Sequence, residues 1–413
     1  MGKHTTNEDY WYINNKAYDL TKFEHPAGPI ALGLGRGRDA TQLFYSYHPF
    51  SIHKAEAILK KYEVKNVPEE QIVQSKFFDW HTKSEFFEQL RTEVKAALPK
   101  NTKASFERWV QIAVMIVLSV VLTYYYILGH WWALIAAPLS LWVLGVNTFH
   151  DASHFALSND WRVNAFFTYP YPWFSSPFTW YHQHVIGHHC YTNIHKEDPD
   201  LHHSARLWRY TRRSRHLSHY KWQCYYLFLV WMMITTALAF IIDALFFVKG
   251  KYHGVVKMMR ISRTRFWAHV LGRLFGLVVV FLWPYFVYES MWKAYIWSVV
   301  PNLIFGFSFS LSSQLSHLTD ENLDQFDKEW HKHQVITSHT FAPDSLFWFF
   351  FTGGLSLQIE HHLFPGVNHW HLRTIHPIVK RVCEEHGIPY TMSATMTDAF
   401  KKHMSLLDEL SRK

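Results

Sequence analysis

Three clusters of histidine have spacings that suit metal binding. They are HDASH with His150 and His154, HVIGHH with His184, His188 and His189, and QIEHH with Gln358, His361 and His362. Because residues four apart on a helix share a face, His150 and His154 can direct their imidazoles at one point. His184 and His188 repeat that spacing, while His189 is turned to one side. The clusters therefore predict a metal site with two donors at one point and a third at a neighbouring point, which suits two adjacent ions.

The number and type of these residues indicate iron. Structural zinc closes a four-coordinate shell, often with thiolates, and catalytic zinc takes about three protein ligands. With His317, which follows the last apolar segment, the chain offers eight imidazoles and no cysteine ligand. Two ions with open coordination positions fit better, and iron is the metal that activates oxygen. Nearby polar residues are expected to orient the ligands: Asp151, Asn193, Asp198, Asp200, Asp320 and Glu360.

Five apolar segments must position these histidines: Trp109–Leu128, Trp131–Phe149, Tyr225–Val248, Phe266–Tyr288 and Ala294–Ser312. The first two are free of charge, and at about 1.5 Å per residue each is long enough to cross a bilayer. The turn between them has no lysine or arginine. The positive-inside rule therefore places that turn outside, and the N-terminal part of the chain in the cytosol.

The third apolar segment is predicted to lie along the membrane or to dip into it without crossing. Both of its flanks are basic, RRSRHLSHYK before it and KGKYHGVVKMMRISRTR after it, and Asp243 lies near its end. Hydropathy alone indicates five crossings, but flanks on the same side require an even number. With four crossings, all the histidine clusters fall on one face of the membrane.

Composition fits a membrane protein that also has polar, basic parts. Hydrophobic residues make up 49% of the 413 residues, yet 18% are charged, and Lys+Arg exceed Asp+Glu by 41 − 33 = 8. Because much of this basic excess flanks apolar segments, anionic lipid headgroups are favoured over nucleic acid as its partner. The three cysteines form no paired motif and fit a reducing compartment, and the polar N-terminus predicts no cleavable signal peptide.

The three clusters resemble the histidine boxes of the membrane fatty acid desaturases. Glutamine at the first position of the third box, with FTGG and LFPG around it, resembles the front-end group of that family. The resemblance covers most of the chain and implies one set of metal ligands: His150, His154, His184, His188, His189, His317, His361 and His362, with Gln358 at the variant position. In related enzymes the residue four positions before the histidine that corresponds to His317 can contact a metal through a water molecule. In this chain that residue is Ser313.

The N-terminal residues resemble cytochrome b5 through FEHPAGP and GRDATQLFYSYHP. The resemblance implies that His25 and His48 are axial haem ligands, and such a pair suits electron transfer because it leaves no open site on the iron. One position departs from the family, which usually has His-Pro-Gly-Gly where this chain has Ala27 before Gly28. Alanine adopts a positive φ less readily than glycine, so a b5-like domain without haem is the alternative.

The resemblance implies a mainly α fold, a four-transmembrane-helix histidine-box desaturase with an N-terminal α+β cytochrome b5-like domain. The expected divisions are a haem domain at 1–67, an amphipathic linker at 68–105 with helices that lie on a surface, and a desaturase domain at 106–413. The implied cofactors are two non-haem iron ions and haem b, with electrons from NAD(P)H through cytochrome b5 reductase. The implied location is the endoplasmic reticulum membrane, with both termini and the histidine boxes cytosolic.

The implied activity is front-end desaturation, in which O2 is used to insert a cis double bond between an existing double bond and the carboxyl end of an acyl lipid or acyl-CoA. The GHHCYTN…DPD region leans toward a delta-5-type enzyme. Three alternatives stay open. They are a sphingolipid long-chain-base desaturase, a related diiron lipid hydroxylase, and a membrane-anchored haem carrier with an inactive metal site, against which the intact histidine set counts.

Overall fold

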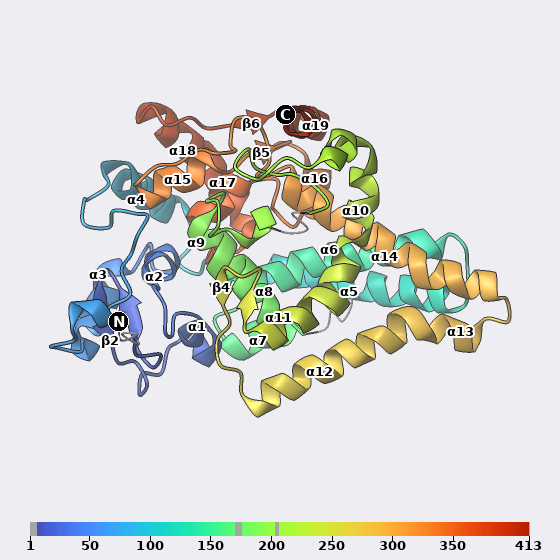
Figure 1. Cartoon of the computed structure of the whole chain (residues 1–413), viewed down its shortest axis with the longest axis horizontal. Coiled ribbons are helices and arrows are strands. Elements are labelled where there is room, and N and C mark those ends of the chain that lie inside the picture. The colour runs from blue at the N-terminus through green and yellow to red at the C-terminus, as the bar shows by residue number, and fades with distance from the viewer. Residues whose placement is uncertain (1–5, 170–175, 203–205, 413) are drawn as a thin grey trace.

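The computed structural model describes residues 6–169, 176–202 and 206–412, and this part of the chain is mainly helical, as predicted. Figure 1 shows the N-terminal domain on one side and a set of long helices that project toward the other, with the C-terminal helices above them. Two short helices that carry box histidines, α9 (His189–Tyr191) with His189 and α17 (Gln358–Leu363) with His361 and His362, lie between these parts.

The N-terminal domain combines one hairpin with three short helices: β1 (Trp11–Ile13), β2 (Lys16–Tyr18), α1 (Gly28–Leu34), α2 (Thr41–Tyr47) and α3 (Ile52–Leu59). The hairpin turns at Asn14 and Asn15, whose φ angles of 48° and 59° are the left-handed values that a two-residue turn requires. Trp11, Tyr18 and Leu59 are among the side chains of its buried core. This mixture of strand and helix agrees with the expected α+β domain.

The segment after this domain contains the helix α4 (Glu85–Ala97). Ser84 caps it, because its hydroxyl accepts a hydrogen bond from the backbone N–H of Phe87. The expected amphipathic character of this segment is present in α4, which has one apolar face. Its apolar face packs against α18 (Leu372–Glu385), where Phe86 and Leu90 are 1% and 0% exposed. A hydrophobic pattern shows that a face is covered, and it does not show by what.

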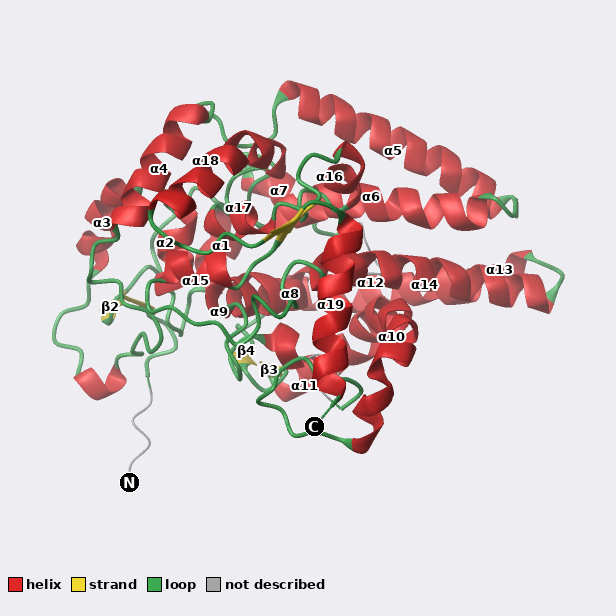
Figure 2. Ribbon diagram, turned by 90° about the horizontal axis from the view of Figure 1, so that it is seen from above, coloured by secondary structure: helices red, strands yellow, loops and turns green. Residues whose placement is uncertain are grey.

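Within the described residues, five helices are long and apolar enough to cross a membrane: α5 (Phe106–Ile127), α6 (Ala133–Ser153), Ser218–Leu245 with α10 (Gln223–Ala237) inside it, Arg263–Val287 with α12 (Arg263–Leu277) and α13 (Trp283–Val287), and α14 (Met291–Gln314). α6 packs against both α5 and α14. Figures 1 and 2 show α5, α6 and α14 running in a common direction, whereas α10 lies across α14.

Most of the other elements are short. Among them are α7 (Trp161–Phe167), α8 (Pro177–Trp180), the π-helix η3 (Tyr181–His188), α11 (Asp243–Lys249), β3 (Lys251–Tyr252), β4 (Val256–Lys257), α15 (Trp330–Ile336), β5 (Thr340–Phe341), α16 (Leu346–Phe351) and β6 (Met392–Ser393), and the longer helix α19 (Met396–Ser411) lies near the C-terminus. β5 and β6 pair in parallel, which ties the C-terminal segment to the chain that precedes α17.

The N-terminal domain packs on the rest of the protein through an apolar interface. Ile30 and Leu34 of α1 share a buried cluster with Tyr181 and Val185 of η3. Gly28 lies so close to Trp161 that a Cβ atom at this position would stand 2.5 Å from the indole. Van der Waals contact and apolar burial therefore hold the N-terminal domain against η3, which carries most of the second histidine cluster, and against Trp161.

Part of the basic loop contacts the N-terminal domain. Lys257 and Arg260 both form ion pairs with Glu8, and the Arg260 pair spans 3.0 Å. The guanidinium of Arg38 also donates to the backbone carbonyl of Lys257, at 2.8 Å. These cations of the loop therefore serve an internal contact.

Candidate metal centre

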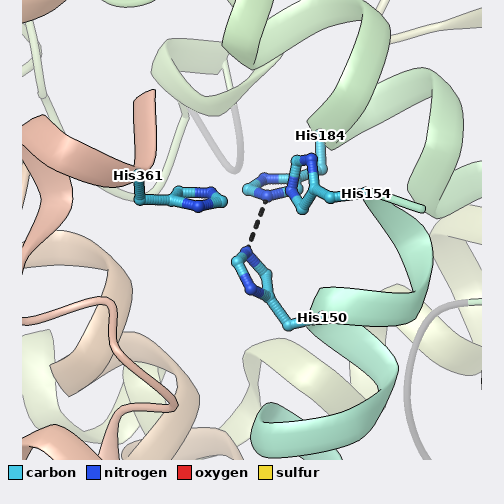
Figure 3. Close-up of side chains that lie close together, drawn as sticks. All are labelled: His150, His154, His184 and His361. Atoms are coloured by element: carbon cyan, nitrogen blue, oxygen red, sulfur yellow. Dashed lines mark hydrogen bonds between the residues drawn. The ribbon is translucent and has the colours of Figure 1, made fainter. Parts of the chain in front are cut away.

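The first group of imidazoles lies where α6 ends. His150 and His154 come from the end of that helix, His184 from η3 and His361 from α17, and their candidate ligand atoms lie within 4.8 Å of one another. The Nε2 atoms of His150 and His184 are 3.2 Å apart. Figure 3 shows the four rings gathered around one point from three separate segments. The helical spacing correctly predicted that His150 and His154 converge.

A second group lies beside the first. His188, His317 and His362 also place their candidate ligand atoms within 4.8 Å of one another, and the Nε2 atoms of His188 and His317 are 3.1 Å apart. The amide nitrogen of Gln358 lies 2.7 Å from His317 Nε2 and 3.1 Å from His362 Nε2. The amide oxygen has no partner among the described residues. Because the two ends of an amide can exchange by a simple flip, this oxygen can occupy the same point as a metal ligand.

The π-helical winding of η3 decides which histidines of the second cluster meet. A π-helix has more residues per turn than an α-helix. His184 and His189, five positions apart, therefore share a face, with their Nε2 atoms 3.2 Å apart. His188 joins the second group, so the α-helical expectation that His184 and His188 point at one place was wrong. His189 Nε2 also lies 3.1 Å from His361 Nε2, so His189 borders the first group.

The geometry fits two bound metal ions. All eight histidines are 7% exposed or less. Their neighbouring Nε2 atoms, 3.1–3.2 Å apart, match two ligands of one ion, because metal–nitrogen bonds of about 2.1 Å at right angles separate the nitrogens by about 3 Å. His154 Nε2 is buried and has no hydrogen-bond partner among the described residues. Such an unsatisfied donor set suits a transition metal that prefers imidazole, as iron does.

Four of these imidazoles use Nδ1 for a hydrogen bond that points away from the centre. The Nδ1–H groups donate from His188 to the Asp198 carboxylate at 3.1 Å, from His317 to the Thr337 carbonyl at 3.1 Å, from His362 to Gln334 Oε1 at 2.7 Å, and from His154 to the Tyr47 hydroxyl oxygen at 2.6 Å. A bond of this kind fixes the tautomer in which Nε2 is free to bind a metal.

Two of these partners, Gln334 and Tyr47, had no signal in the sequence. Gln334 lies in α15, which matches no recognised motif. Tyr47 belongs to the N-terminal domain and meets His154 only because that domain docks on the rest of the chain. The one local feature that could have drawn attention to Tyr47 is its position immediately before His48.

Asn193 was predicted to orient ligands, and it contacts two groups that adjoin them. Its backbone N–H donates to the carboxylate of Asp198 at 2.8 Å, and its side-chain amide donates to the carbonyl of His317 at 3.0 Å. Asn193 has a φ of 57°, a left-handed value that asparagine adopts more readily than most residues. Its contacts therefore hold the partner of His188 and the backbone of His317.

Glu360, also predicted to orient ligands, faces away from both imidazole groups. It is 0% exposed, and its carboxylate accepts hydrogen bonds from His376 at 2.9 Å and from the Tyr390 hydroxyl at 2.6 Å. Burial alone would lower the pKa of His376, but the bond and charge of Glu360 outweigh it and raise that pKa. Among the described hydrogen bonds, Glu360 therefore anchors α17 to the C-terminal region rather than to a box histidine.

Asp151, also predicted to orient ligands, belongs to a buried charge network beside the first group. The Nδ1–H of His369 donates to the Asp151 carboxylate at 2.7 Å, and His369 Nε2 accepts from the Arg108 guanidinium at 3.0 Å. Arg108 is 0% exposed and also donates to the side chain of Asn147 at 2.7 Å. The network ties α5 and α6 to the segment that follows α17, immediately next to His150.

The haem ligands expected in the N-terminal domain face each other across a cavity of about 460 Å³. The rings of His25 and His48 have centroids 5.9 Å apart. His48 Nδ1–H donates to the Phe44 carbonyl at 2.7 Å, which leaves Nε2 for a haem iron. Burial lowers the pKa of His25 to about 4, so this imidazole is neutral, as ligation requires.

The alanine that departs from the b5 pattern is not strained. Ala27 has a φ of −79°, an ordinary value for any residue, and the positive φ of this turn, 83°, falls on Gly28. The glycine that the turn requires is therefore the one that the chain retains, and the backbone around His25 keeps the form that the motif needs.

A small apolar pocket of about 50 Å³ adjoins both imidazole groups. Aromatic side chains of α6 and α14 line it, among them Trp142, Phe149 and Phe305, together with His150 of the first group and His317 of the second. A nonpolar chain that entered between α6 and α14 would thus meet both groups at once.

The chain is similar to known proteins over almost its whole length. Residues 127–394 match the Fatty acid desaturase family, and residues 1–67 match the Cytochrome b5-like Heme/Steroid binding domain. Acyl-lipid (8-3)-desaturase B of Dictyostelium discoideum is 31% identical over 98% of this chain and 92% of its own. Delta(5) fatty acid desaturase A of the same organism is 30% identical over 98% and 92%. The Acyl-lipid (8-3)-desaturase of Mortierella alpina is 28% identical over 98% and 95%. The chain therefore belongs to the fatty acid desaturase family and carries a fused cytochrome b5-like domain, which together imply a non-haem iron pair and a haem.

Proposed function

We propose that this protein is a front-end desaturase of the delta-5 type, which inserts a cis double bond between an existing double bond and the carboxyl end of a fatty acyl lipid. The observation that carries the proposal is the meeting of two buried imidazole groups with an apolar pocket between α6 and α14. Relatives named as delta-5 and 8-3 desaturases, similar over 98% of the chain, support the position of the new bond.

The imidazoles divide between two ions in this proposal. One ion is held by His150, His154, His184 and His361, and the other by His188, His317 and His362, with His189 and Gln358 at their borders. The iron pair, when bound, supplies the O2 chemistry that removes two hydrogens from adjacent methylenes. The protein fixes four of the rings through their Nδ1 bonds. It also excludes water from a centre in which every histidine is buried.

The apolar pocket would select which methylenes reach the metal centre. Trp142 is held in place because its indole N–H donates to the carbonyl of Phe351 at 2.8 Å, and its ring packs edge-on against Phe305, with centroids 5.4 Å apart. A rigid aromatic wall beside the imidazoles limits how far an acyl chain can pass. The position of the new double bond then follows from the distance between this aromatic wall and the carboxyl end of the bound acyl chain.

The proposal includes a topology with both termini and the histidine groups on the cytosolic side of the endoplasmic reticulum membrane. The hairpins α5–α6 and α12–α14 would cross, and the course of α10 across α14 supports a third apolar segment that does not. Electrons would come from NAD(P)H through cytochrome b5 reductase to the haem domain. Anionic headgroups would contact exposed cations of the basic loop such as Lys249 and Lys251.

Yeast that express the chain and are fed single polyunsaturated fatty acids test the proposal directly. Profiling of the fatty acid methyl esters should show a new double bond on the carboxyl side of an existing one. A matched culture that expresses His361→Ala should lack this product while the protein retains its haem absorbance. If wild-type protein is present and haem-loaded but forms a sphingoid or hydroxylated product, or none, the proposal is wrong.

A further inference from the structure

Tyr47 joins the two cofactor sites of this protein. Its hydroxyl oxygen lies 2.6 Å from His154 Nδ1 in the first imidazole group. Its backbone is bonded directly to that of His48, which faces His25 across the haem cavity. One side chain and one hydrogen bond therefore connect a haem-ligand candidate with a metal-ligand candidate.

The surroundings of Tyr47 keep this connection short and rigid. The haem cavity is lined by Tyr47 and also by His154 and Val185, which belong to the desaturase part of the chain. The Tyr47 ring packs edge-on against Phe155, with centroids 6.2 Å apart. Beside the Tyr47 ring, Ile30 of the N-terminal domain and Val185 of the desaturase part belong to one buried apolar cluster, which holds the two parts together. The two cofactor sites thus share a wall, and Tyr47 belongs to that wall.

The bond also has a chemical direction. For His154 to bind a metal through Nε2, its proton must be on Nδ1, so His154 is the donor and the Tyr47 oxygen is the acceptor. Nε2 of His154 is buried and has no other partner among the described residues. Tyr47 therefore fixes both the tautomer and the orientation of this ring from the haem domain.

We propose that Tyr47 is the positioning residue through which the haem domain passes electrons to the metal centre, an inference that rests on the proposed function. In each transfer one electron leaves a ferrous haem iron, which becomes ferric, and reduces one ferric ion of the metal pair to ferrous. No bond forms or breaks, and Tyr47 keeps its own proton and electrons. Its role is to hold His154 in contact with the segment that carries His48. This contact exists only when the haem domain is docked on the desaturase domain.

The test uses the full-length, iron- and haem-loaded protein with Tyr47→Phe, which removes only the hydroxyl. Tyr45→Phe is the matched control, because it lies on the same helix and loses a comparable bond, to Glu56 at 3.2 Å. The haem is reduced, substrate and O2 are mixed in, and the reoxidation of the haem is followed by its absorbance. Haem content, haem midpoint potential and iron content are measured on the same samples.

Tyr47→Phe should slow haem reoxidation by about 10- to 100-fold, the usual cost of losing an outer hydrogen bond to a metal-bound histidine. Haem content, midpoint potential and iron content should match those of Tyr45→Phe. A small chemical reductant that reaches the metal pair directly should restore single-turnover product in Tyr47→Phe to the wild-type level.

Two outcomes would overturn the inference. Reoxidation of the Tyr47→Phe haem at the wild-type rate would show that electrons take another route. Loss of product that persists with the direct reductant would show that Tyr47 supports only the shape of the metal site. Failure of the proposed function is distinct, because the wild-type protein itself would then form no desaturated product with either source of electrons.

Discussion

At the scale of single residues, the charges beside the metal centre are balanced through a neutral histidine. Arg108 and Asp151 have opposite charges and are 0% and 3% exposed, and His369 lies between them, with hydrogen bonds to both. A buried charge is tolerated only when a partner compensates it. The network therefore stabilises the fold around His150, in addition to any effect on metal binding by the His150 imidazole.

Asp151→Asn should lower the free energy of unfolding by about 3–5 kcal/mol, because it leaves the buried Arg108 cation without a counter-charge. Thermal unfolding in detergent, followed by circular dichroism, measures the effect. Glu107→Gln, an exposed carboxylate one residue from Arg108, is the control and should change little. Equal stability of Asp151→Asn and the control would mean that the charges are not coupled.

The pair of His376 and Glu360 should make stability depend on pH. The pKa of His376 is raised above its ordinary value of 6.5 in the folded protein. When the pKa is higher in the folded protein than in the unfolded chain, the contribution of the pair to stability is complete below the pKa of the unfolded chain. It is lost as the pH rises through the pKa of the folded protein. Stability should therefore fall as pH increases from about 6.5 upward, and His376→Gln should remove this part of the slope. An unchanged slope in His376→Gln would refute the assignment.

The candidate ligands were predictable from sequence, whereas most of the residues that orient them were not. Seven of the eight histidines are recognisable because they occur in three short clusters whose spacing suits metal binding. Gln334 and Tyr47 contact His362 and His154 across long stretches of chain. Such contacts are set by tertiary packing, and a single isolated residue carries no pattern that reveals them.

At the scale of elements, local winding corrected one expectation, and packing showed what covers the apolar face of α4. The π-helix of η3 pairs His184 with His189 instead of with His188. Sequence spacing assumes 3.6 residues per turn, so a local change of winding is invisible to it. The amphipathic pattern of α4 correctly indicated one apolar face, but α18, which covers that face, lies near the other end of the chain.

The packing of α4 on α18 should be a main source of stability for the part of the protein outside the long apolar helices. Leu90 is 0% exposed in this contact, so Leu90→Ala should destabilise the protein by about 2–5 kcal/mol through lost burial and a cavity. Glu85→Ala, at an exposed position of the same helix, should cost far less. Urea unfolding in detergent compares the two. Equal losses of stability in the two variants would contradict this packing.

At the scale of the whole molecule, the haem domain and the desaturase domain form one packed unit around two neighbouring sites. The domain content was evident in the sequence, because the b5-like and histidine-box motifs are each contiguous. Their contact was not, because Ile30, Gly28 and Trp161 look like ordinary core or surface residues in isolation. The basic loop illustrates the same limit, since its charge pattern does not reveal that Lys257 contacts Glu8.

Docking of the two domains should depend more on apolar packing than on these ion pairs. Ile30→Asp places a charge in the buried cluster with Tyr181 and Val185 and should release the domain, so that amide hydrogens of α1 and η3 exchange faster. Glu8→Lys should have a small effect, because exposed ion pairs contribute about 0–1 kcal/mol and are screened by salt. Hydrogen exchange by mass spectrometry distinguishes these cases, and strong release by Glu8→Lys alone would contradict this ranking.

The central claim is that the buried imidazoles form a metal centre separate from the haem, and the iron content of the purified protein tests it most directly. Chemical iron analysis of wild-type protein, corrected for haem by absorbance, should give about two non-haem ions per chain, as the two imidazole groups require. His361→Ala should lose non-haem iron while its haem stays at the wild-type level. A fully haem-loaded, folded wild-type protein that binds no non-haem metal when supplied with ferrous iron would contradict the account.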